Sequence, residues 1–182
     1  MQQTLRFKLD NPDINQRRVI LERCLEAFGS FRYEKHLEAC FFICQEMGII
    51  SEKYNFYREN DPREKSPYYS RLFNEDISML CKQGVIHLNY LEEDHLVYSK
   101  QGVEYPRRDE KPKPEWAFLL SRATPPTVIN LAKLLALSRI ERTSPDSGYA
   151  RDIFRSLKLS SGKYREVMTL YRKLKNSVDK RS

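Results

Sequence analysis

Glycine is scarce in this chain of 182 residues, which contains only six. Nucleotide-cradling loops and turn-rich β-barrels need positive backbone φ angles at many points, and glycine supplies them most readily. The sequence also lacks a Gly-rich phosphate loop and the HExxH, GxSxG and CxxC motifs. No spaced set of carboxylates with a basic partner, as nuclease active sites require, is present either. These absences predict a chain that is not an enzyme and that carries no cofactor.

Long apolar runs are absent too, because no stretch approaches the ~18 apolar residues of a membrane span. Residues 1–8 lack the apolar segment of a secretory signal. The four cysteines are Cys24, Cys40, Cys44 and Cys81, and the middle two lie one helical turn apart within an apolar run. We therefore expect reduced, buried thiols rather than a disulfide or metal site, in a cytoplasmic protein without membrane contact.

Positive charge is in excess, since 32 Lys+Arg face 25 Asp+Glu and the net charge is +7. The excess is confined to one part of the chain: residues 111–182 hold 16 basic and 6 acidic side chains, whereas residues 1–110 hold 16 and 19. The break coincides with residues 106–114, which contain three prolines and no apolar side chain other than proline. Such a segment is typical of a linker, so we expect one module over residues 1–105 and another over 115–182.

The front module shows three helical patterns and then a change of period. Apolar residues recur at three- and four-residue steps over 14–28, 33–47 and 66–82. Two β-rich runs follow, over 85–91 and 95–98, separated by three acidic residues. Three helices followed by a small β-hairpin is the element order of a winged-helix module.

Five motifs within residues 30–103 carry a resemblance to a known group of proteins. FRYEKHL at 31–37, YNFY at 54–57, SPYYSRL at 66–72 and DISMLCKQGVI at 76–86 resemble the YwgA-like and Panacea-like small bacterial proteins. VYSKQG at 97–102 is similar to a common ending of winged-helix domains. The third motif departs from the families by lacking a glycine and inserting a tyrosine. The resemblance implies a regulatory or adaptor fold, and it brings no catalytic residues.

Two features of the chain favour contact with a protein partner. The run over residues 128–140 is apolar on most sides, so a helix there must be buried within its own domain or against another protein. Five aromatic side chains, before and at the start of the third predicted helix, are expected to be exposed and to contact a partner. They are Tyr54, Phe56, Tyr57, Tyr68 and Tyr69.

The end of the chain is the strongest candidate site. A short helix over 150–157, a step at 158–160 and a longer helix over 163–176 match the layout of a helix-turn-helix, although the turn lacks its usual glycine. Ser160 or Ser161 is a candidate cap for the second helix. The candidate nucleic-acid contacts are basic: Arg151, Arg155, Lys163, Arg165, Arg172, Lys173 and Lys175.

The sequence thus predicts a mainly α protein with a small β-hairpin, in which a winged-helix-like module precedes a basic, helix-turn-helix-like module. We expect it to bind nucleic acid, DNA rather than RNA, without catalysis and within a larger bacterial complex. One alternative is an adaptor, like the small middle component that accompanies SMC-like ATPases in antiviral defence operons. A second is a transcriptional regulator or antitoxin that dimerises on DNA. The terminal helix could also dock an acidic partner or serve solubility alone.

Overall fold

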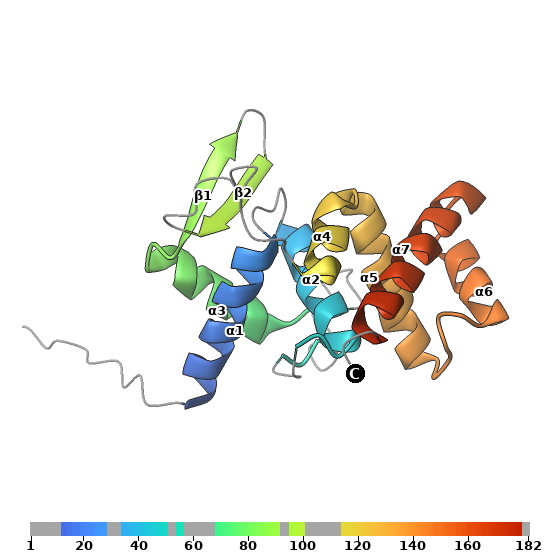
Figure 1. Ribbon diagram of the computed structural model, residues 1–182, viewed down its shortest axis with the longest axis horizontal. Coiled ribbons are helices and arrows are strands. Elements are labelled where there is room, and N and C mark those ends of the chain that lie inside the picture. Colours follow the sequence, from blue (N-terminus) through green and yellow to red (C-terminus); the bar gives the residue numbers. More distant parts are fainter. Residues whose placement is uncertain are drawn as a thin grey trace, which may run out of the picture.

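The computed structural model describes residues 12–28, 34–50, 54–56, 68–91, 95–100 and 114–179. Seven helices account for most of these residues, so the prediction of a mainly α chain is confirmed. The elements in chain order (Figure 1) are α1 (Pro12–Phe28), α2 (Glu34–Glu46), α3 (Arg71–Lys82), β1 (Ile86–Leu91), β2 (His95–Lys100), α4 (Glu115–Arg122), α5 (Pro125–Ile140), α6 (Gly148–Ser156) and α7 (Ser161–Asp179). Strands β1 and β2 pair antiparallel, with Ile86 opposite Lys100 and Leu91 opposite His95.

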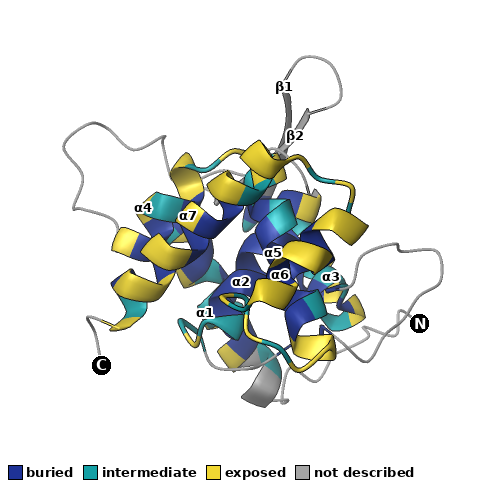
Figure 2. Cartoon of the chain, turned by 90° about the vertical axis from the view of Figure 1, so that its right-hand side faces the viewer, coloured by how far each residue is buried: buried dark blue, intermediate teal, exposed yellow. Residues whose placement is uncertain are grey.

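Helix α2 is the most deeply buried element, because every residue from 36 to 45 is buried. Helix α5 packs against it, and the buried faces of the helices turn toward one another in Figure 2. The polar residues of α2 bind backbone groups of neighbouring segments. The Gln45 side chain donates to the Tyr54 carbonyl (2.7 Å) and accepts from the Tyr54 N–H (3.2 Å), and Glu38 accepts from the Ser70 N–H (3.1 Å). These bonds offset the cost of burying the two side chains.

Three of the aromatic residues predicted to contact a partner belong instead to the core. Tyr54, Phe56 and Tyr68 are only 1%, 2% and 2% exposed. The ring centroids of Phe56 and Tyr68 lie 5.4 and 5.2 Å from that of Phe42 on α2. The expectation that these three side chains are exposed is therefore wrong: the segments that carry them fold back over α2 and fill its surface.

The segment before α3 also differs from the prediction. The helix begins directly after Ser70 and not at Ser66, because the Ser70 Oγ caps it by accepting from the Phe73 N–H at 3.3 Å. Tyr69, another predicted contact residue, is half-buried beside this cap. Tyr57, the last of the set, lies outside the described residues, as does Ser66.

Helix α5 confirms that most of the apolar run over 128–140 is buried, although Ile140 at its end is 57% exposed. The helix starts at Pro125, where the Thr124 Oγ1 accepts from the Thr127 N–H at 3.4 Å. Its buried side chains face α2, α6 and α7 of the same chain. The apolar character of this helix is thus accounted for without a second protein.

The cysteines of the first two helices are buried, as expected from their positions on the apolar faces. Cys24, Cys40 and Cys44 are at most 4% exposed, and they are free thiols. Burial raises the pKa of the Cys24 thiol to about 12 and raises that of the other two as well. All three therefore stay protonated at neutral pH and act as small apolar side chains.

Buried side chains from both halves of the chain form one continuous cluster. Trp116 of α4 lies edge-on to Phe28 of α1, with ring centroids 5.4 Å apart. The predicted linker 106–114 lies outside the described residues except for Pro114, which precedes α4.

Candidate nucleic-acid interface

The α6–α7 connection is a short turn with a defined hydrogen-bond pattern. Lys158 takes the left-handed conformation (φ 54°), and the next N–H, from Leu159, donates to the Phe154 carbonyl at 3.3 Å. The Ser160 Oγ then accepts from the Lys163 N–H at 3.4 Å, which confirms Ser160 as the cap of the second helix. Lysine thus occupies the position where glycine is expected in such a turn.

Both helices use their apolar faces to pack on the rest of the molecule. Helix α7 packs on α4 and α5, and α6 packs on α5. Near the turn they meet through the rings of Phe154 and Tyr164, whose centroids are 4.8 Å apart. The two helices lie at the end of the molecule opposite β1 and β2, on the right in Figure 1. Their outward faces are formed by exposed polar residues.

A hollow of about 500 Å³ lies between the outward sides of α6 and α7. Arginines from both helices line it, and none of its lining residues is acidic. Phe154 and Met168, both almost fully buried, contribute to the wall. We call this feature the arginine hollow; its four arginines are Arg151, Arg155, Arg165 and Arg172.

The four arginines differ in their ion pairs. Arg155 pairs with Asp152 on its own helix, at 3.1 Å. The Arg172 Nε lies 3.9 Å from a carboxylate oxygen of Asp146. Arg151 and Arg165 make no ion pair with any carboxylate of the described residues. The guanidinium groups therefore give the hollow a positive potential suited to an anionic ligand.

The three predicted lysines lie outside the arginine hollow. Lys163 and Lys173 are exposed but do not line it. The Lys175 Nζ lies 3.1 Å from Asp146 Oδ2 and 6.0 Å from the centre of the Tyr171 ring. The hydrogen bond that Lys175 donates to Asp146 raises the pKa of Lys175. The structure thus brings four of the seven predicted basic residues together and places the other three elsewhere.

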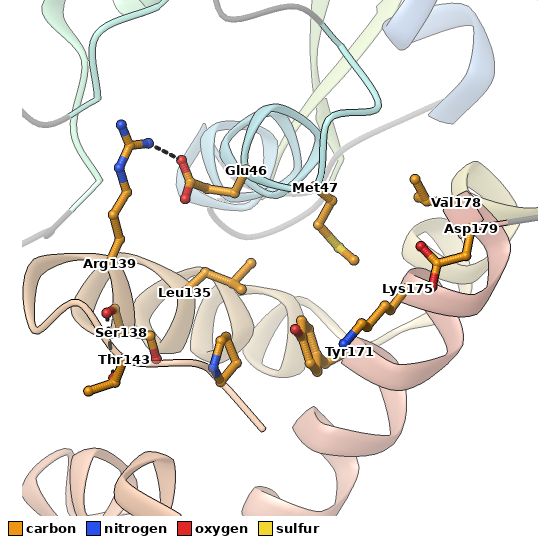
Figure 3. Close-up of a pocket in the computed structure, with 11 residues that line it drawn as sticks. Glu46, Met47, Leu135, Ser138, Arg139, Thr143, Tyr171, Lys175, Val178 and Asp179 are labelled. Carbon is orange, nitrogen blue, oxygen red and sulfur yellow. Dashed lines mark hydrogen bonds and ion pairs between the residues drawn. The ribbon is translucent and has the colours of Figure 1, made fainter. Parts of the chain in front are cut away.

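Lys175 borders a second cavity, of about 310 Å³, between α2, α5 and α7 (Figure 3). Glu46 and Arg139 pair at one side of it, while Tyr171 and Lys175 lie at the other. The buried Ser138 hydroxyl, also in its wall, has no hydrogen-bond partner among the described residues. Because cationic and anionic side chains alternate around this cavity, it has no excess of one charge.

Several residues of the interface were not predicted from the sequence. Thr169 and Tyr164 line the arginine hollow, and helical spacing from Arg165 and Arg172 could have indicated Thr169. Asp146 precedes α6 in a turn, and nothing in its local sequence indicates that it pairs with α7. Contacts of this kind depend on the tertiary fold.

Among the described residues, no group of histidine, cysteine or acidic side chains is placed to hold a metal ion. None of the described helices combines the length and apolar character needed to cross a bilayer. No protein-family model, curated protein or solved structure matches this chain.

Proposed function

We propose that this chain binds nucleic acid through the arginine hollow, with α6 and α7 acting as a helix-turn-helix-like module. The observation that supports the proposal most is that four guanidinium groups from two helices border one hollow with no acidic lining residue. Arginine binds phosphate oxygens through two parallel hydrogen bonds. Such contacts position a protein on the nucleic-acid backbone and do not read sequence.

The arrangement favours backbone contact over catalysis. A ligand in the hollow would meet guanidinium groups and the hydroxyls of Ser161 and Thr169, none of which is a nucleophile activated by a neighbouring base. DNA is the expected ligand, within a larger assembly in which the front helices and the strands form a winged-helix-like module that makes protein contacts. The resemblance to YwgA-like and Panacea-like proteins supports such a regulatory role.

The adaptor alternative has less support in the structure than in the sequence. Its two supporting features were the apolar run that forms α5 and the aromatic residues of the front half. Helix α5 is covered by α2, α6 and α7, and three of the aromatic residues are in the core. Neither feature therefore requires a partner.

The proposal is tested with the full-length chain and a fluorescent DNA duplex of mixed sequence, by measuring anisotropy between about 50 and 200 mM salt. Each phosphate contact contributes about −0.9 to the slope of log K against log salt. We expect the double variant Arg151→Gln/Arg165→Gln to bind roughly tenfold to a hundredfold more weakly and to have a slope shallower by about 1.8.

The control variant is Lys35→Gln/Lys82→Gln, which removes the same charge from exposed positions on α2 and α3, outside the hollow. It is expected to bind almost as well as the wild-type chain. Equal weakening in both double variants would mean that net charge, and not the arginine hollow, drives binding. Competition by unlabelled single-stranded DNA and RNA establishes which nucleic acid is preferred.

A further inference from the structure

Asp146 pairs with one lining residue of the arginine hollow, Arg172, and with one of the second cavity, Lys175. It lies in the turn before α6, where its N–H donates to the Ser144 Oγ at 3.3 Å and the Ser147 N–H donates to the Ser144 carbonyl at 2.9 Å. Its carboxylate points to α7, with one oxygen 3.1 Å from the Lys175 Nζ and the other 3.9 Å from the Arg172 Nε. The turn therefore presents an anion to two cations that are three residues apart on one helix.

This arrangement resembles the way in which proteins hold a phosphate group. Phosphate oxygens are bound by arginine and lysine side chains through charge-assisted hydrogen bonds. Here the two oxygens of Asp146 face one arginine and one lysine. Arg172 belongs to the arginine hollow, so two of its four cations, Arg155 and Arg172, already have an anion from within the chain.

We propose that Asp146 is an internal competitor that limits the affinity of the arginine hollow for phosphate by neutralising Arg172. The inference rests on the proposed function. Nucleic acid would bind first through Arg151 and Arg165, and it would engage Arg172 fully only after the contact with Asp146 is lost.

The expected size of the competition is modest. The side chains of Arg172 and Asp146 are 68% and 36% exposed, and their separation of 3.9 Å is long for an ion pair. Exposed pairs of this kind shift an equilibrium by about twofold to fivefold. Asp146 would therefore set the affinity and its salt dependence without preventing binding.

Asp152 provides a matched control for this proposal. It is an exposed aspartate on α6 that pairs with Arg155 at 3.1 Å, through the i,i+3 spacing of a single helix. Replacement of either aspartate by asparagine removes one negative charge near the same hollow. Asp152 neutralises Arg155, whereas only Asp146 links the turn before α6 to α7 and competes for Arg172, so the effects of the two aspartates depend on different arginines.

The test compares Asp146→Asn with Asp152→Asn in the full-length chain, again by anisotropy on the DNA duplex across the salt series. We expect Asp146→Asn to bind about twofold to fivefold more tightly at low salt and its log–log slope to steepen by about 0.9, equivalent to one further phosphate contact. In an Arg172→Gln background, the gain in affinity from Asp146→Asn is expected to be lost, whereas any gain from Asp152→Asn, which frees Arg155, is expected to remain.

Two results would overturn the inference while the proposed function stands. They are a full effect of Asp146→Asn in the Arg172→Gln background and weaker binding by Asp146→Asn. The last result, together with a lower melting temperature, would mean that Asp146 positions α6. If the wild-type chain does not bind, or if Arg151→Gln/Arg165→Gln binds equally well, the proposed function fails and the inference fails with it.

Discussion

Buried ionisable side chains are the residues on which this fold depends most sharply. Arg17 of α1 and Asp76 of α3 form an ion pair at 2.8 Å, with both side chains 9% exposed. The Tyr54 hydroxyl donates to the same carboxylate at 2.9 Å, and burial with the nearby Asp76 charge raises its pKa. Removal of one partner from such a group leaves an uncompensated buried charge, which is more costly than the loss of a surface pair. The group therefore links α1, α3 and the segment that carries Tyr54.

His36 on α2 gives the fold a predictable dependence on pH. The residue is 7% exposed, and burial lowers its pKa from 6.5 to about 4. Between these values the unfolded chain binds a proton that the folded chain does not. The free energy of unfolding therefore falls as pH falls through this window, by up to about 3 kcal/mol.

We expect His36→Gln to reduce this loss, and urea unfolding of both proteins at about pH 7.5 and about pH 4.5 measures it. The informative quantity is the difference in the free energy of unfolding between the two pH values, because the packing cost of the substitution is the same at both. The same pH-dependent loss in both proteins would contradict the prediction.

At the level of single residues, exposure was the hardest property to predict. Basic side chains of α6 and α7 are outside, as helical spacing indicated, because an amphipathic helix has a distinct solvent face. Tyr54 and Tyr68 lie between helices, where no period distinguishes a buried ring from an exposed one. Their burial depends on how the connecting segments fold over α2, which the local sequence does not encode.

Four helices of this protein end in the same way. After α2 and α3, Gly48 and Gly84 take φ angles of 68° and 71°, and after α5 and α6, Arg142 and Lys158 take 52° and 54°. In each case the N–H of this residue and the next N–H donate to carbonyls of the last helical turn. The left-handed conformation has no steric cost for glycine, whereas it strains a side chain with a Cβ.

This strain predicts that Lys158→Gly stabilises the protein by about 0.5–1 kcal/mol. The matched control is Gly84→Ala, which is expected to destabilise it by a similar amount. A Cβ at Gly84 meets no atom within 4 Å, so only the backbone conformation opposes it. Urea denaturation monitored by far-UV circular dichroism measures both effects, and a destabilised Lys158→Gly variant would show that the lysine side chain makes a compensating interaction.

The presence of a helix was easier to predict than the residues at which it begins and ends. Apolar patterns predicted the helices that form α1, α2, α3, α5, α6 and α7, because each must bury apolar side chains in the core. The predicted start of α3 was wrong, because Ser66 and Ser70 are both residues that can cap a helix. In the structure Ser70 is the cap, and its N–H donates to Glu38 on α2. The arginine hollow likewise needed the crossing of two helices, whose relative placement depends on α5.

The front half of the chain is nearly neutral and the back half is basic, but the two halves share one hydrophobic core. Helix α5 packs on α2, and Trp116 of α4 contacts Phe28 of α1. The surface that we propose for nucleic acid is therefore supported from below by helices of the front half. A change in the front half can reach it through this core.

The final prediction is that the two halves unfold together. Phe73 of α3 is fully buried among front-half rings, 5.0 Å from the centroid of Phe41. We expect Phe73→Leu to cost ~1.5 kcal/mol and to lower the melting temperature by roughly 3–6 °C.

Trp116, the single tryptophan, lies on α4 of the back half and contacts Phe28 of α1, so its fluorescence reports on the contact between the two halves. If α2 and α5 form one cooperative core, its fluorescence transition falls by the same amount as the far-UV circular dichroism transition, because loss of the front half exposes the apolar face of α5. A tryptophan transition that stays at the wild-type temperature, while part of the helical signal melts earlier, would instead establish two modules of independent stability. In that case residues 115–182 could be studied alone as a nucleic-acid-binding unit. With coincident transitions, binding studies require the intact chain.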